Sequence, residues 1–205
     1  VYGATRRFPD EITQELAQIK ALVGERPFGV DLVLPPGMPE HDSREAIEID
    51  IPDEHKAFVQ SIIEQYNIPP ATQPGMRTRF IRSAEIEAAQ IQSVLASPVN
   101  MFACGIGAPA PVIEAAKAQG MTTLALIGSP HHVARTIAAG VDIIVAQGYD
   151  AGAHTGTIGT YSLFPQIVEA AGDVPVLVAG GVATGKHIAA ALAMGAQGVW
   201  MGTAW

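Results

Sequence analysis

The stretch MTTLALIGSPHHVARTIAAGVDIIVAQG, residues 121–148, decides the fold. It contains an apolar run at 121–128, an alanine-rich segment with helical spacing at 130–139, and a second apolar run at 141–148. Apolar runs without polar alternation are typical of strands buried on both faces, which occur in parallel sheets covered by helices. The stretch therefore predicts a strand, helix and strand unit of an α/β protein.

The same unit continues in both directions along the chain. Further strands are expected at 28–36, 98–105, 174–181 and 197–205, and further helices at 9–25, 83–95, 109–119, 161–171 and 184–194. An open doubly wound sheet and a closed barrel both fit this alternation. Glycine-rich or polar residues directly follow each strand, which favours the barrel, because these positions share one face there. We expect one domain over residues 1–205, an incomplete (β/α)8 TIM barrel with about six of its eight strands.

Residues 37–80 interrupt this regular pattern. A polar, proline-containing loop is expected at 37–52, a helix at 53–67 and a second proline-rich loop after it. The helix would carry an apolar face of Ala57, Phe58, Ile62 and Ile63. Because the segment follows a strand end, it is either a lid over a pocket or a surface excursion.

Composition narrows the classes of partner and compartment. The 205 residues carry a net charge of −8 with no cluster of Lys and Arg, which argues against nucleic acid or an anionic membrane as the partner. The apolar runs are too short to span a bilayer. A single cysteine, Cys104, excludes an internal disulfide and fits a cytoplasmic location. It is expected to be a packed side chain, and no metal site is expected, because no cluster has ligand spacing.

The loop GYDAGAHTG, residues 148–156, points to a ligand. Its small residues bury little area, so it does not serve mainly to fill a core, and its glycines permit a close approach to another group. His154 can titrate near neutrality and so move a proton. An ordinary exposed loop histidine is the alternative.

Two glycine turns follow the last two strands. Gly180 and Gly181 precede a helix that opens near Thr184, and Gly202 follows the final strand. Backbone N–H groups in such turns can hold a phosphate, and barrels often place one after the seventh and eighth strands. The alternative for each turn taken alone is a tight connection after a strand, with no ligand bound.

Three motifs, AQGYDAGAHTG (146–156), AGGVATG (179–185) and GAQGVWMGTAW (195–205), resemble the nitronate monooxygenases, which are FMN-containing (β/α)8 barrels. This chain has Asp150 where the family has Glu and Ala153 where it has Gly. Asp31 stands where the family commonly has Asn. Compared with the family, the first two strands and whatever follows Trp205 are missing.

The resemblance implies a set of site residues. His154 would be the catalytic histidine beside the flavin, and Gln147 would hydrogen-bond the ring. The residues expected to bind the cofactor are Asp31, Gln147, Gly152, Ala153, Gly180, Gly181, Met201, Gly202, Thr203 and Ala204. His131 and His132 are expected to open a helix, and Trp200 to be a core residue or a pocket wall.

The function implied by the resemblance is FMN-dependent oxidation of alkyl nitronates with O2, giving a carbonyl compound and nitrite. The alternative is an NAD(P)H-dependent FMN reductase of the quinone reductase or enoyl-acyl carrier protein reductase type. A flavin-binding protein without turnover is a third interpretation. A homo-oligomer is compatible with each of them.

Overall fold

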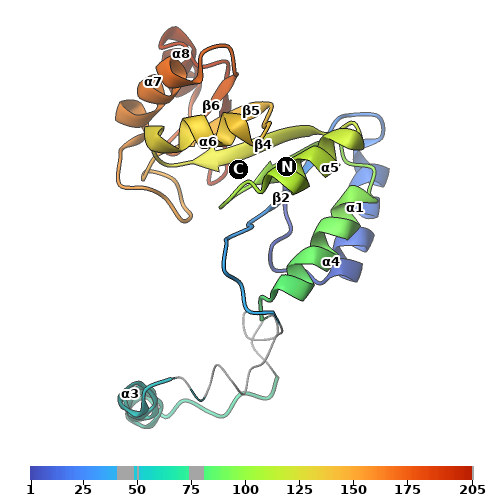
Figure 1. The fold of residues 1–205 in the computed structure, drawn as a ribbon. Coiled ribbons are helices and arrows are strands. Elements are labelled where there is room, and N and C mark those ends of the chain that lie inside the picture. Colours follow the sequence, from blue (N-terminus) through green and yellow to red (C-terminus); the bar gives the residue numbers. More distant parts are fainter. Residues whose placement is uncertain (41–48, 50, 74–80, 205) are drawn as a thin grey trace.

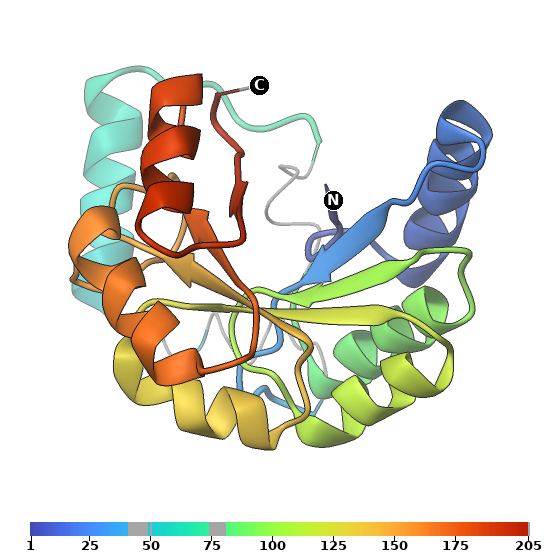
Figure 2. The same cartoon turned by 90° about the horizontal axis from the view of Figure 1, so that it is seen from above.

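The computed structural model describes residues 1–40, 49, 51–73 and 81–204 of the chain. Seven parallel strands form one curved sheet in chain order. The strands are β1 (Tyr2–Gly3), β2 (Gly29–Leu32), β3 (Met101–Cys104), β4 (Thr122–Ile127), β5 (Ile143–Gln147), β6 (Val176–Ala179) and β7 (Gly198–Trp200). Viewed from above, the sheet curls into an incomplete barrel whose open side lies between β1 and β7 (Figure 2). The expected partial TIM barrel is confirmed.

The sheet has one strand more than the six expected. Tyr2 and Gly3 pair in parallel with Val30 and Asp31 of β2. A two-residue strand that ends in glycine has no periodic pattern from which sequence could identify it. The segment before the first helix is therefore part of the sheet.

The expected helices are present outside the sheet. They are α1 (Pro9–Val23), α4 (Ala84–Leu95), α5 (Ala110–Ala118), α6 (Val133–Ala138), α7 (Thr160–Ala171) and α8 (Gly185–Ala193). The segment expected as one helix at 130–139 is instead a 3₁₀ turn, η1 (Pro130–His132), followed by α6. Ser129 caps this turn by accepting a hydrogen bond from the His131 amide, and His131 and His132 open the helical segment, as expected.

Apolar side chains pack on both faces of the sheet. On the helix side, one core gathers around α1, α4 and α5, and a second around α7 and α8. The face that lines the barrel interior carries Ala103, Leu124, Val145 and Ala179, with Trp200 packed against them. Burial on both faces explains why the strands read as continuous apolar runs.

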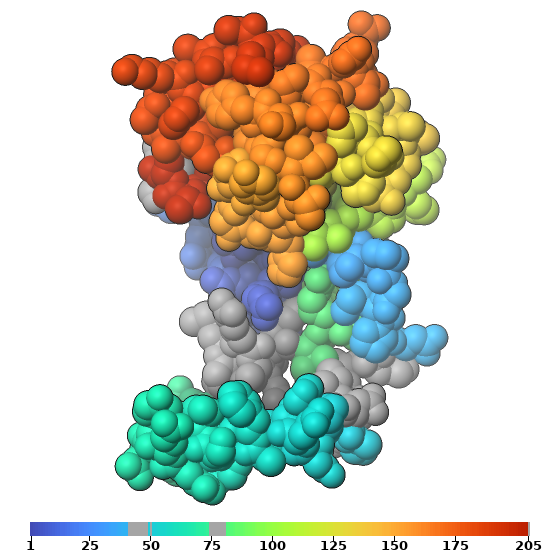
Figure 3. Space-filling model, turned by 90° about the vertical axis from the view of Figure 1, so that its left-hand side faces the viewer, coloured from blue at the N-terminus to red at the C-terminus, as the bar shows by residue number. Residues whose placement is uncertain are grey.

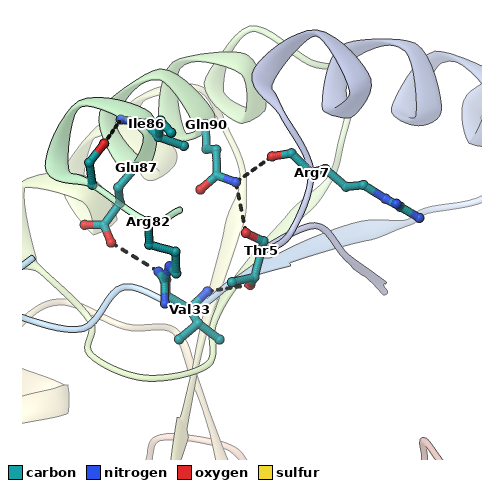
Figure 4. Close-up of polar contacts among 8 residues, drawn as sticks. Thr5, Arg7, Val33, Arg82, Ile86, Glu87 and Gln90 are labelled. Atoms are coloured by element: carbon teal, nitrogen blue, oxygen red, sulfur yellow. Dashed lines mark hydrogen bonds and ion pairs between the residues drawn. The ribbon is translucent and has the colours of Figure 1, made fainter. Parts of the chain in front are cut away.

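Hydrogen bonds and an ion pair join the segment that follows the 37–80 excursion to the residues after β1 and β2. Arg82 donates to the Val33 carbonyl and pairs with Glu87, and buried Gln90 donates to the carbonyls of Thr5 and Arg7 (Figure 4). These contacts tie the start of α4 to the ends of β1 and β2.

Helix α3 (Asp53–Gln65) is the described centre of this excursion, and it confirms the helix expected at 53–67. It has no buried residue and stands apart from the barrel (Figures 1 and 3). Phe58, on its expected apolar face, is 66% exposed. The predicted loops at 37–52 and beyond residue 67 lie partly outside the described residues. The interpretation of 37–80 as a lid stays a prediction.

Candidate active site

Two cavities adjoin each other at the carboxyl ends of the strands. The larger measures about 1190 Å³ and the smaller about 550 Å³. Leu126 and Gln147 line both, so the two spaces meet at the ends of β4 and β5. Active sites of barrel enzymes lie at this face.

The smaller cavity is lined mainly by glycine and alanine residues. Gly180 and Gly181 have φ angles of +107° and +69°, which side-chain-bearing residues rarely adopt. A Cβ at Gly180 would also lie 2.6 Å from Thr160 Oγ1. Since glycine has no side chain, these residues and Gly202 line the cavity with main-chain atoms. Such a wall suits an anionic group that binds peptide N–H groups.

The loop that carries His154 is closed at its base. Tyr149 donates its amide to the Ile158 carbonyl, and the Asp150 carboxylate accepts the amide of Thr160 at the start of α7 at 2.7 Å. Hydrogen bonds from Thr160 lower the pKa of Asp150. Asp150 therefore anchors the loop to α7, a role for which its charge suits the helix N-terminus.

Glycines bring this loop against the end of β4. A Cβ on Gly156 would lie 2.4 Å from the Gly128 carbonyl oxygen, and one on Gly128 would lie 2.7 Å from the Gly156 nitrogen. The two backbones thus touch where neither residue has room for a side chain. This packing explains Gly156 of the motif and Gly128 after β4, and His154 lines the larger cavity.

The larger cavity combines apolar walls with basic side chains. Leu34, Pro35, Met38, Ile106, Pro109 and Ile158 provide much of the apolar surface. His154, His132 and Arg135 also line it, and Arg135 has no ion-pair partner within 4 Å among the described residues. Burial, then repulsion by Arg135 and His131, lowers the pKa of His132. The carboxylate on the described lining, Glu87, already pairs with Arg82 at 3.3 Å.

Most of the predicted site residues come together. Those that line the smaller cavity are Gln147, Gly152, Ala153, Gly180, Gly181, Gly202, Thr203 and Ala204. His154 lines the larger one, seven positions along the chain from Gln147. The Met201 side chain packs instead against the helix-side core. Asp31 lines neither cavity and lies on β2, on the barrel side of the sheet.

Other candidates have structural roles. His187 accepts the Ala183 amide on Nδ1 at 3.2 Å, which stabilises the turn after β6. Cys104 is buried, and burial followed by the charge of Asp31 raises the pKa of its thiol to about 12. The thiol therefore stays protonated at neutral pH, as expected of a packed side chain. In the part of the chain that the structure describes, no group of three His, Cys, Asp or Glu residues has the geometry to hold a metal ion.

The sequence did not single out Arg135, and it left Trp200 as either a core residue or a pocket wall. Arg135 follows His132 by three residues, and this spacing after a strand end was the available signal. Trp200 packs on the barrel side with Ala179 and lines the smaller cavity. Alternation along β7 would have shown which face of the sheet Trp200 occupies only if the pairing register of this strand with β6 had been known.

The apolar runs were expected to be too short to span a bilayer, and the lengths and hydropathy of the helices test this expectation. Among the described residues, none of the helices combines the length and apolar character required to cross a bilayer.

Comparison with known proteins gives a consistent family. The chain matches the nitronate monooxygenase family over residues 1–205. It is 39% identical to Rv1533 of Mycobacterium tuberculosis, which carries the provisional name of a monooxygenase; the match covers 100% of this chain and 57% of the relative. It is 34% identical to a probable nitronate monooxygenase of Staphylococcus haemolyticus, with 95% and 54% covered. The chain thus spans little more than half the length of these relatives.

Solved structures support the same conclusion. A nitroalkane oxidase from Streptomyces ansochromogenes superposes with a TM-score of 0.77 at 30% identity, covering 98% of this chain and 56% of that one. A FabK mutant from Thermotoga maritima gives a TM-score of 0.69 at 21% identity, covering 98% and 51%, and shows the fold alone. By its motifs, its fold and its match along the whole sequence, the chain belongs to the nitronate monooxygenase family, a family of oxidoreductases.

Proposed function

We propose that the protein uses FMN and O2 to oxidise alkyl nitronates, such as propionate 3-nitronate, to a carbonyl compound and nitrite. The observation that carries the proposal is that a cavity lined mainly by glycine and alanine joins one lined by His154, His132 and Arg135. The first suits a phosphorylated cofactor, and the second suits a small anion.

The residues present fit FMN. The phosphate would be held by backbone N–H groups at Gly180, Gly181 and Gly202, where a Cβ on Gly180 would fill the space that the turn needs. The Thr203 hydroxyl lies near Gly152, since a Cβ there would be 3.0 Å from Thr203 Oγ1. Gln147 lines both cavities and would hydrogen-bond the ring. Bound FMN would supply the electron-accepting chemistry that no protein side chain provides.

The protein side chains would bind the substrate and handle its proton. A nitronate is an anion, so the basic side chains of the larger cavity would hold it by charge-assisted hydrogen bonds. With a neutral nitroalkane, His154 would take the proton from the carbon that bears the nitro group. The loop closure by Asp150 would keep His154 in position for both steps.

A nitrite assay tests this proposal. The intact flavin-loaded protein is incubated aerobically with propionate 3-nitronate and no nicotinamide. We expect nitrite to be released in proportion to the protein. Absence of nitrite, together with rapid oxidation of NADH by a quinone or an enoyl thioester, would overturn it.

The second candidate is an NAD(P)H-dependent FMN reductase. One observation favours it: about 1190 Å³ is more space than a small nitronate needs, since pockets for drug-sized ligands measure roughly 300–1,000 Å³. A relative from Rhodococcus jostii, 35% identical over 114 residues, is named as a dehydrogenase of a bicyclic carboxyl-CoA. This match covers 56% of the chain and 32% of the relative. NADH consumption with quinone or enoyl thioester substrates distinguishes this activity from the first.

A further inference from the structure

Thr160 is the first residue of α7 and is buried, with 1% of its surface exposed. The first amides of a helix have no partner within the helix and need one from elsewhere. Gly159, which precedes α7, has no side chain with which to cap the helix. The Thr160 amide bonds instead to a residue ten positions earlier, the carboxylate of Asp150, at 2.7 Å.

Two glycines that follow neighbouring strands pack against Thr160. A Cβ on Gly148, after β5, would lie 2.3 Å from both Cα and Oγ1 of Thr160. A Cβ on Gly180, after β6, would lie 2.6 Å from the same Oγ1 atom. Since these distances are too short for any side chain, the end of β5 and the turn after β6 both contact α7 at this one residue.

The Thr160 hydroxyl faces one acceptor from each of two motifs. It donates to the carbonyl of Ala179 at the end of β6, at 3.4 Å, and it interacts with the Asp150 carboxylate. Hydrogen bonds from the Thr160 amide, and then from its hydroxyl, lower the pKa of Asp150, so this group is an ionised acceptor at neutral pH. Asp150 itself lies against the turn, since a Cβ on Gly181 would be 3.3 Å from the Asp150 Cβ.

The loop that carries His154 is held to the same turn by its backbone. The Gly148 amide donates to the Ala179 carbonyl at 3.1 Å, and the Ala151 amide donates to the Gly148 carbonyl at 3.1 Å. A Cβ on Gly180 would lie 3.1 Å from the Ala151 nitrogen. Compact loops whose ends lie close together pack as units. A shift at the start of α7 would therefore displace the loop and the turn together.

We propose that Thr160 is a positioning residue that ties the loop carrying His154 to the turn at Gly180 and Gly181, so that one side chain sets the place of the proton-accepting histidine relative to the cofactor phosphate. Thr160 lines neither cavity, so it acts through these two segments and touches no ligand. The inference rests on the proposed function, in which the turn holds the phosphate and His154 takes a proton from a nitroalkane. Loss of the hydroxyl should weaken both functions at once.

The chain offers a matched control at the other end of the strands. Thr123, near the start of β4, is fully buried, and its amide and hydroxyl both donate to Asp142 Oδ2 at 2.8 Å. This pair lines neither cavity. Thr123→Val and Thr160→Val therefore remove a hydroxyl from the same kind of Thr and Asp pair, and only the second pair adjoins the site.

Hydrogen exchange of the intact flavin-free protein measures the tie directly. In Thr160→Val we expect the amides of residues 148–156 and of residues 180–185 to exchange at least about threefold faster than in the wild type, because contacts within one network are energetically coupled. Thr160→Ser keeps the hydroxyl and should restore the wild-type rates, whereas Thr123→Val should leave both segments unchanged. Asp150→Ala alters an exposed residue, and it should loosen the same two segments even if Thr160→Val does not fold.

Two functional ratios should change with the exchange rates. The ratio of FMN affinity to riboflavin affinity should fall about three- to tenfold in Thr160→Val, because riboflavin has no phosphate for the turn to hold. In the flavin-loaded protein, kcat for a neutral nitroalkane should fall about three- to tenfold more than kcat for the preformed nitronate, which needs no proton transfer. A residue that only stabilised the fold would change neither ratio, as we expect for Thr123→Val.

The outcomes separate the inference from the function on which it rests. Faster exchange in only one of the two segments, or in neither, would overturn the tie. Equal changes of the two ratios in Thr160→Val and Thr123→Val would overturn it as well. Failure of the proposed function looks different, because the wild type would then bind no FMN or release no nitrite, while exchange in the flavin-free protein would still decide whether Thr160 joins the loop to the turn.

Discussion

The two sides of the barrel mouth are built on different principles. After β5, β6 and β7, the site is lined mainly by glycine and alanine, and the charged residue on this lining, Asp150, accepts the amide of Thr160. Within β2, the barrel side holds the Asp31 carboxyl group, whose Oδ1 has no hydrogen-bond partner among the described residues, and the excursion after this strand leads to an exposed helix. Among the described residues, the charged anchor of the first side has its partner, whereas one carboxyl oxygen of the second has none. We therefore refer to the first as the complete side and to the second as the incomplete side.

Replacing His154 should have the largest effect on the complete side. For His154→Asn we expect turnover of neutral nitroalkanes to fall by about 10²–10⁴-fold, because proton transfer by a positioned side chain contributes that much. Turnover of preformed nitronates should fall far less, since they need no deprotonation. Steady-state nitrite release with both substrates measures this.

The matched control is His131→Asn. His131 is an exposed histidine that lines neither cavity, so its replacement should leave both rates unchanged. Equal losses with nitroalkane and nitronate in His154→Asn would contradict a role as base.

Adding a methyl group to the glycine turn should come next. Gly180→Ala forces an unfavourable φ of +107° and places Cβ 2.6 Å from Thr160 Oγ1, so we expect a loss of about 2–4 kcal/mol in the free energy of unfolding and weaker FMN binding. Gly185→Ala is the control, because nothing lies within 4 Å of its Cβ. Denaturant unfolding and FMN titration of both variants decide the matter, and similar behaviour of the two would count against the turn geometry.

The incomplete side should respond to pH. The pKa of Asp31 is raised above its unfolded value, so the folded state favours the neutral acid. Its contribution to stability is full below about pH 4 and is lost as the pH rises through about 6, by about 2–3 kcal/mol. We therefore expect Asp31→Asn to be more stable than the wild type at pH 8 and to match it more closely at pH 4, in the absence of flavin. Unfolding curves at both pH values test this, and a difference independent of pH would contradict it.

The smallest effect is expected at the rim of the larger cavity. Arg135→Gln should raise KM for a carboxylate-bearing nitronate about three- to tenfold and leave kcat nearly unchanged, because an exposed charge contributes mainly to binding. The comparison is Arg26→Gln, since Arg26 lines neither cavity. If both variants raise KM alike, the general charge of the protein matters and Arg135 does not.

The same division describes what could be predicted from sequence. The complete side follows from local signals: apolar runs predict β5 and β6, and the glycines after them predict turns with unusual backbone angles, which Gly180 and Gly181 have. The closing bond between Asp150 and Thr160 was not predicted. It joins two residues ten positions apart, and no periodicity reports such a contact.

The incomplete side depends on neighbours that are distant in sequence. The inward direction of Asp31 follows from alternation, but its lack of a partner arises because β1 and β3 offer Gly3, Ala103 and Gly105 around it. The strand β1 was itself missed, since two residues carry no pattern. Contacts between residues distant in sequence, and not the intrinsic propensities of single residues, determine this half of the site.

The central claim is that the backbone turns after β6 and β7 hold the phosphate of FMN in a site completed by His154. The most direct measurement is a comparison of FMN and riboflavin binding to the flavin-free protein by fluorescence titration. Several hydrogen bonds to a charged group, each worth about 1.5–3 kcal/mol, predict one FMN per chain and at least about 10²-fold weaker binding of riboflavin. Equal affinities for the two flavins, or no binding of either, would contradict the account.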